Sequence, residues 1–198
     1  MSSPINLAVI VGSVRQARFG PNIARWFGKL AEQHGQFDVT IVDLAETEIP
    51  LSLGPVPPKH ATTDQRPPSM APLTAQLESA DAFVVVTPEY NHSYPASIKA
   101  LIDWHYTEWR AKPVGFVSYG AHAGGLRAVE ALRPVFAQMH AVTMRDSVSF
   151  VHYWGQFDQE AKLRDPSNAE SAAKILLDQL IWWADSLRTA RANKPYTG

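Results

Sequence analysis

The stretch NLAVIVGSVRQARFGPNIARW, residues 6–26, decides the fold. Branched apolar residues dominate 5–11, which predicts a strand buried on both faces, as in parallel sheets. Pro21 stands where a helix is expected to begin, because the first helical position tolerates its missing N–H. Between them, the loop 12–20 carries hydroxyl and guanidinium groups and no acidic residue. Such a loop at a helix N-terminus favours a bound phosphate.

Beyond this stretch, predicted strands alternate with predicted helices. The further strands are expected at 37–44, 81–86, 113–119 and 141–150, and the helices at 23–34, 71–79, 95–109, 126–138 and 165–192. This alternation favours a parallel sheet covered by helices on both faces. We expect one α/β domain over 1–198, a flavodoxin-like three-layer sandwich with a five-stranded parallel sheet in the order 2-1-3-4-5.

The segment 45–72 interrupts the alternation. It contains seven prolines, a density that excludes a helix or a strand. A linker between domains would also be proline-rich, but the residues that follow do not resemble an independent domain. We therefore expect a long surface loop, and such loops in compact domains are often functional.

The composition excludes several classes of protein. A formal net charge of −1 argues against nucleic acid or an anionic membrane as partner. No apolar run approaches the ~20 residues that span a bilayer, and the N-terminus has no basic segment typical of a signal peptide. The chain has no cysteine, which excludes disulfides and thiolate metal sites and fits a cytoplasmic location.

Three polar loops are expected to meet at one end of the sheet. They are 13–20, 88–94 and 118–125, and each follows a strand that neighbours the others in the predicted order. The direction of winding changes between strands one and three, and ligands bind at that point, outside the carboxyl ends of the strands. We therefore expect one binding site built from these three loops.

Each loop offers a different kind of contact. Ser13 can donate to a phosphate, and Arg15 and Arg18 can each bind one in bidentate fashion. Residues 87–91 could line a flat heteroaromatic ring, or they could form a turn in which Tyr90 covers the core. The glycines of 118–125 allow the backbone to approach a ligand closely.

Other aromatic and histidine residues leave alternatives open. His92 and His122 could face a substrate or simply be polar loop residues. The cluster Trp104, Tyr106 and Trp109 could form a partner interface or a pocket wall. The same cluster could instead pack beneath the final helix with residues 182–183.

No motif for a catalytic residue or a metal site is present. The sequence lacks the nucleophile elbow, the paired-histidine zinc motif and an evident pair of carboxylates. We therefore predict no catalytic side chain and no metal. A phosphate-binding α/β domain of this kind is expected when a bound cofactor carries the reaction.

Three segments together resemble the NADPH-dependent FMN reductase family of flavodoxin-like flavin, quinone and azo reductases. They are GSVRQARFGPNIARW (12–26), PEYNHSYPASIKALIDW (88–104) and SYGAHAGGLRAVEALRP (118–134). Arg18 stands where other members have serine. The resemblance implies FMN as cofactor, with its phosphate held by Ser13, Arg15, Arg18, Phe19 and Gly20. The flavin ring would lie against Pro88, Glu89, Tyr90 and Asn91 on one side and Ser118, Tyr119 and Gly120 on another.

The resemblance also implies an activity. NADPH or NADH would reduce the flavin at N5, and a small-molecule quinone, azo or flavin acceptor would reoxidise it in a ping-pong reaction. Family members are commonly homodimers or homotetramers. Two alternatives stay open: a flavin reductase that supplies a monooxygenase, and a non-catalytic FMN-binding redox sensor or electron carrier. The net charge of −1 argues against the carrier, because flavodoxin carriers are usually strongly acidic.

Overall fold

The computed structural model describes residues 3–197, and its centre is one parallel sheet. The strand order is β2-β1-β3-β4-β5, with β6 also paired to β4, as the sequence predicted for the main path. The strands are β1 (Ile5–Val11), β2 (Phe37–Asp43), β3 (Ala82–Pro88), β4 (Pro113–Gly120), β5 (Val142–Thr143) and β6 (Val148–Val151).

The strand predicted at 141–150 is divided into two pieces, which corrects the expectation of one continuous strand. Both pieces pair with β4, β5 near its start and β6 near its end. Between them, the guanidinium of Arg133 donates hydrogen bonds to the carbonyls of Met144 and Arg145, at 2.6 and 3.0 Å. These carbonyls are bonded to a helix side chain, and the strand is interrupted at this point.

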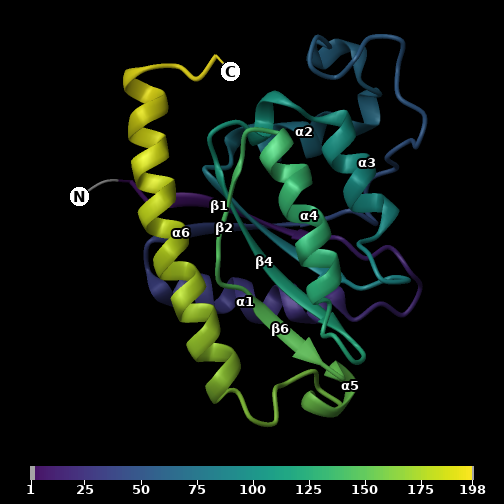
Figure 1. The fold of residues 1–198 in the computed structure, drawn as a ribbon, viewed down its shortest axis with the longest axis vertical. Helices are drawn as coiled ribbons and strands as arrows, with labels where there is room; N and C mark the ends of the chain where they lie inside the picture. Colours follow the sequence, from purple (N-terminus) through teal and green to yellow (C-terminus); the bar gives the residue numbers. More distant parts are fainter. Residues whose placement is uncertain (1–2, 198) are drawn as a thin grey trace.

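Helices cover both faces of the sheet (Figure 1). On one face lie α1 (Gly20–His34) and α6 (Ser167–Asn193). The other face carries α2 (Ala71–Ser79), α3 (Ala96–Trp104) and α4 (Leu126–Gln138). None of the described helices is both long enough and apolar enough to cross a bilayer.

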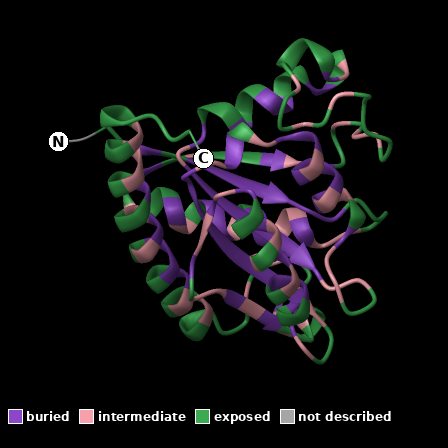
Figure 2. Cartoon of the chain, turned by 45° about the horizontal axis from the view of Figure 1, so that its top comes forward, coloured by how far each residue is buried: buried purple, intermediate pink, exposed green. Residues whose placement is uncertain are grey.

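The two faces explain why the central strands β1, β3 and β4 are apolar at most positions. In β1, Val9 and Val11 belong to the core beneath α1 and α6, whereas Ala8 and Ile10 belong to the opposite core. Successive strand residues point to opposite faces, so a sheet covered on both sides needs a continuous apolar run. Figure 2 shows the central strands buried and the outer helix faces exposed, whereas the edge strand β2 is partly exposed.

The proline-rich segment 45–72 is a surface excursion beside α2 and α3 (Figure 1). It contains no strand, but it does contain two short 3₁₀ helices, Thr63–Gln65 and Pro68–Met70, which the sequence analysis excluded. A 3₁₀ turn needs few backbone donors, so it tolerates neighbouring prolines. The segment is fixed by an ion pair between Arg66 and Glu108, with side chains 4% and 1% exposed.

One expectation for the aromatic cluster at 104–109, that it packs beneath the final helix, is wrong. The helix ends at Trp104, and Trp109 is buried between Phe83 and Phe136, with ring centroids 4.7 and 5.4 Å away. This core lies on the face opposite α6, so the cluster cannot pack beneath that helix. Trp109 is too deeply buried to form an interface or a pocket wall. Tyr106 is only partly buried, so an interface at this residue stays a prediction.

Candidate functional site

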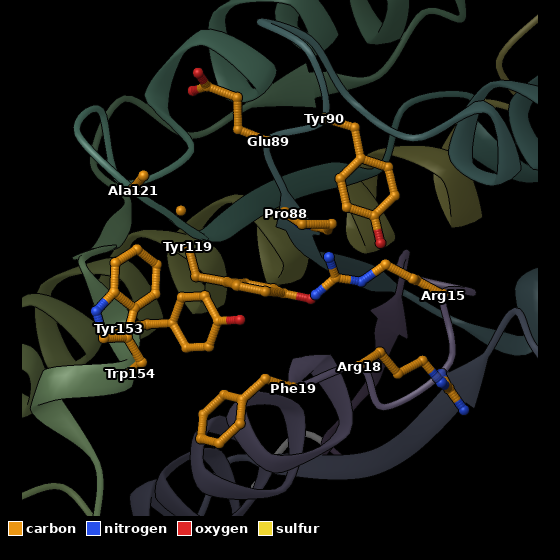
Figure 3. A pocket seen from close by; sticks show the side chains of 11 residues that line it. Arg15, Arg18, Phe19, Pro88, Glu89, Tyr90, Tyr119, Ala121, Tyr153 and Trp154 are labelled. Carbon is orange, nitrogen blue, oxygen red and sulfur yellow. The ribbon is translucent and has the colours of Figure 1, made fainter.

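A cleft opens at the carboxyl ends of β1, β3 and β4, where the sequence placed the site. Its cavity measures about 180 Å³ (Figure 3). The predicted residues that line it are Arg15, Arg18, Phe19, Pro88, Glu89, Tyr90, Tyr119 and Gly120. Three others, Ser13, Gly20 and Ser118, are buried. Asn91 lies at the tip of a turn outside the lining.

The first loop forms a tight cradle around Gly20. A Cβ atom at this position would lie 2.5 Å from Ser13 Oγ and 2.9 Å from the Tyr119 hydroxyl, so only glycine fits between the two hydroxyl groups. Ser13 Oγ is fully buried and has no hydrogen-bond partner among the described residues. A buried hydroxyl without a partner is costly, and a ligand oxygen would satisfy it.

The N-terminus of α1 completes this cradle. Its first turn contains no acidic residue, and no side chain caps it. Pro21 has no N–H and the N–H of Asn22 donates to the Phe19 carbonyl, so the helix dipole and the N–H groups of Phe19 and Gly20 favour an anion at this point. Burial raises the pKa of Tyr119 above its usual value, so its hydroxyl stays protonated and can donate. Figure 3 shows the Arg15 guanidinium reaching into the cleft beside that hydroxyl.

Arg18 lines the cleft, but its guanidinium points away from it (Figure 3). Its guanidinium forms an ion pair with Asp43 at 2.5 Å and donates to the carbonyl of Ser13 at 3.0 Å. These contacts attach the first loop to the end of β2. A contact between Arg18 and a phosphate therefore stays a prediction, whereas its support of the loop is visible.

The loop after β3 is fixed by a hairpin turn. Tyr90 and Ser93 exchange backbone hydrogen bonds of 2.8 and 3.1 Å. The two residues between them, Asn91 and His92, have φ values of 49° and 74°, as two-residue hairpin turns require. The Tyr90 side chain lines the cleft, and its hydroxyl points toward Arg15 in Figure 3. The extended segment before it forms one edge of a slot.

The loop after β4 folds back on itself to form the other edge. Ser118 Oγ and Ser149 Oγ both donate to the carbonyl of Gly124, at 2.8 and 2.9 Å. Gly125 has a φ of 87°, and a Cβ there would lie 2.8 Å from the backbone nitrogen of Tyr119. The glycine is thus required for both its conformation and its close approach.

Three more residues line the cavity: Ala121, which lies in the predicted loop 118–125, and Tyr153 and Trp154, which the sequence did not indicate. The last two belong to α5 (Tyr153–Gln156), a single turn that follows β6. A usable signal was present, because an aromatic pair directly after the last strand must lie at the same end of the sheet as the three predicted loops.

Neither of the two histidines considered as substrate contacts lines the cavity. His122 is exposed, and its ring centroid lies 5.1 Å from that of His152. Within residues 3–197, no group of three or more acidic or histidine side chains is arranged to hold a metal ion.

A parallel sheet of this order, with an anion cradle after β1 and a slot between the loops after β3 and β4, defines a flavodoxin-like mononucleotide-binding protein. The chain belongs to the NADPH-dependent FMN reductase family, whose model matches residues 5–155.

Similar proteins come from fungi and bacteria. An NAD(P)H-dependent FMN reductase of Schizosaccharomyces pombe is 39% identical over 119 residues, which are 60% of this chain and 60% of that protein. A quinone reductase of Pseudomonas putida is 28% identical over 177 residues, 83% of this chain and 88% of that protein. FerB, a flavoenzyme NAD(P)H:(acceptor) oxidoreductase of Paracoccus denitrificans, shares the fold with a TM-score of 0.64 at 24% identity, covering 92% and 98% of the two chains.

Proposed function

We propose that the protein is an FMN-dependent NAD(P)H oxidoreductase that reduces quinone, azo or flavin acceptors. The observation that carries the proposal is the buried Ser13 hydroxyl, which lacks a partner among the described residues and lies beside the N-terminus of α1. This arrangement fits the phosphate of a mononucleotide. FMN, when bound, supplies the hydride transfer between the nicotinamide and the acceptor.

The cradle residues would hold the phosphate end. Ser13 and the backbone N–H groups at Phe19 and Gly20 would donate hydrogen bonds, and Arg15 would supply charge from the open side. Arg18 would contribute either directly or by keeping the loop attached to Asp43. The close packing around Gly20 supports this assignment, because it keeps the Ser13 hydroxyl beside the start of α1.

The slot residues would position the ring. Pro88, Glu89 and Tyr90 would form one edge, with Asn91 in the turn beyond them, and Tyr119 and Gly120 would form the other, supported by the buried Ser118. Backbone N–H groups on these edges would stabilise negative charge on the reduced ring. The chain's task is then binding, orientation and exclusion of water, which agrees with the lack of a recognisable catalytic triad in the sequence.

The choice of acceptor rests on the relatives. The Pseudomonas putida quinone reductase matches most of both chains, which supports small conjugated acceptors. No observation favours the two alternatives, a monooxygenase partner or a non-catalytic sensor. We also propose a single flavin-binding domain over 1–198, a cytoplasmic location where NAD(P)H is supplied, and a homodimer or homotetramer. Light scattering of the purified protein tests the assembly.

An anaerobic titration tests the activity. The purified protein, incubated with FMN and freed of excess, is expected to be yellow and to bleach on addition of NADPH or NADH. Quinones, azo dyes or free FMN should then restore the colour. The Ser13→Ala variant should retain less FMN than Ser79→Ala, whose hydroxyl lies on α2, away from the cleft. A protein that takes up no FMN would overturn the proposal, and one that never bleaches would favour the sensor.

A further inference from the structure

A row of aromatic rings leads from the cleft to the surface. Tyr153 packs against Tyr119 and Phe19 at the cleft wall, with centroids 5.2 and 5.1 Å apart. Trp154 lies 5.3 Å from Tyr153 and 5.3 Å from His152. His122 adds the outer end of this aromatic row, which comprises Tyr153, Trp154, His152 and His122. Figure 3 shows its inner half, Tyr153 and Trp154, on the side of the cleft opposite Arg15.

The indole of Trp154 is left open to solvent. Its residue is 59% exposed although it lines the cavity. Its neighbours approach it at steep angles, 73° for Tyr153 and 59° for His152, so neither ring stacks face to face upon it. An exposed indole that also lines a binding cleft can stack on a planar ligand. A planar ring stacked on the indole would cover it.

Backbone hydrogen bonds and buried aromatic packing hold the aromatic row in position. The backbone N–H of His152 donates to the carbonyls of Gly120 and Ala121, at 2.8 and 3.1 Å, which attaches α5 to the loop after β4. Directly after α5, Phe157 is buried and packs against Phe19 at 4.9 Å. The rings therefore do not need a large loop movement before they can receive a ligand, which favours affinity.

The chemistry of the row indicates what it would bind. The indole offers a flat face, and the two imidazoles beside it offer N–H donors at the exposed end. These contacts suit a heteroaromatic ring that carries a phosphate, because an indole can stack on any base and imidazole N–H groups donate to phosphate oxygens. A neutral quinone would use the indole but not the imidazoles.

We propose that the aromatic row is a second subsite, separate from the FMN cradle, for a planar phosphorylated heteroaromatic substrate. This inference rests on the proposed function, since the subsite serves the flavin held next to it. Two substrates share this chemistry: the adenine nucleotide half of NAD(P)H, and free FMN acting as electron acceptor. Trp154 stacks on the ring, and His122 and His152 hold the phosphate.

The test uses the FMN-loaded protein and compares two exposed tryptophans. Trp182, which is 63% exposed on α6, provides the matched control for Trp154. Calorimetric titration with the unreactive probe NADP⁺ gives one arm, and the KM for free FMN gives the other. Trp154→Ala should weaken at least one of them by about fivefold or more, the effect of losing one stacked base. Trp182→Ala should change neither.

The two arms identify the substrate. A loss confined to NADP⁺ assigns the row to the dinucleotide, and a loss confined to the KM assigns it to free FMN. His122→Ala should reduce the same arm by a smaller factor. The inference is overturned if Trp154→Ala leaves both arms unchanged, or if Trp182→Ala has an equal effect. Failure of the protein to take up any FMN would instead contradict the proposed function, so the two failures are distinguishable.

Discussion

The carboxylate of Glu89 joins two loops of the site, because both of its oxygens bond to Arg127. Oε1 accepts from the Arg127 guanidinium at 2.8 Å, and Oε2 accepts from the Arg127 backbone N–H at 3.3 Å. The first residue follows β3 and the second lies in the first turn of α4. An acidic group at a helix N-terminus also interacts favourably with the helix dipole. The slot between the two loops therefore has a defined width.

Removing this link should loosen the ring end of the site more than the fold. The Arg127 side chain is 47% exposed, so Arg127→Ala should lower the free energy of unfolding by less than about 1 kcal/mol. FMN should dissociate severalfold faster, because the slot edges are no longer held together. Stopped-flow measurement of flavin release checks this, with Arg145→Ala as control, since that side chain is 90% exposed. Equal release rates would show that the link does not set the slot.

The charge of Arg15 should matter at the other end of the cofactor. Arg15→Ala is expected to weaken FMN binding by at least about 1.5 kcal/mol, the scale of a hydrogen bond to a charged group. The loss should shrink at high salt, since an exposed cation is screened. Arg25→Ala provides the matched control, because Arg25 lies on α1 and outside the lining of the cleft. If both variants bind FMN equally well, Arg15 does not contact the phosphate.

Local sequence rules carried the prediction of the first loop and of the sheet order. The apolar run at 5–11 and the proline at 21 mark the strand and the helix that bracket the cradle, and both elements form where expected. The rule that ligands bind at the carboxyl ends of parallel strands then brought three distant loops together. The same rule, applied after β6, would have added Tyr153 and Trp154.

Three features of the structure could not be predicted from local sequence, and two of them depend on contacts between distant residues. The position of Arg18 in the first loop predicts a phosphate ligand. Its guanidinium instead bonds to Asp43, which lies 25 residues further along the chain at the end of β2. The break in the fifth strand is marked by Arg133, a helix residue whose bonds to backbone carbonyls have no sequence signal. The turn into α5 places His152 at a φ of 48°, a conformation that no residue pattern predicted.

Lys112 should make the stability depend on pH in the alkaline range. Burial lowers its pKa to about 8, and its ammonium donates to the carbonyls of Leu77 and Glu78. In the unfolded chain its pKa is about 10.4. Between these values the unfolded state binds more protons than the folded state, so the contribution of Lys112 to stability rises with pH, by at most about 1.4 kcal/mol for each unit.

Denaturant unfolding at pH 7.5, 8.5 and 9.5 checks this sign. The difference in the free energy of unfolding between the wild type and Lys112→Met should shift in favour of the wild type as the pH rises. Lys29→Met, on the exposed part of α1, should show no such trend. A difference for Lys112→Met that stays constant over this range would mean that the amine titrates alike in both states.

Two glycines with the same conformation should respond differently to alanine. Gly35 ends α1 with a φ of 79°, and a Cβ there would meet nothing within 4 Å. Gly35→Ala should therefore cost only the left-handed strain, about 1 to 2 kcal/mol. Gly125 has a φ of 87°, but its Cβ would lie 2.7 Å from Ser118 Cβ and 2.8 Å from the nitrogen of Tyr119.

Gly125→Ala should add overpacking to that strain, for a total of about 3 kcal/mol or more. It should also weaken FMN binding, because relief of the contact moves the backbone at residues 118–120, which form one edge of the slot. Denaturant unfolding and FMN titration of both variants separate the two effects. If Gly125→Ala costs no more than Gly35→Ala and retains FMN, the loop after β4 adapts easily, and its close packing does not set the slot.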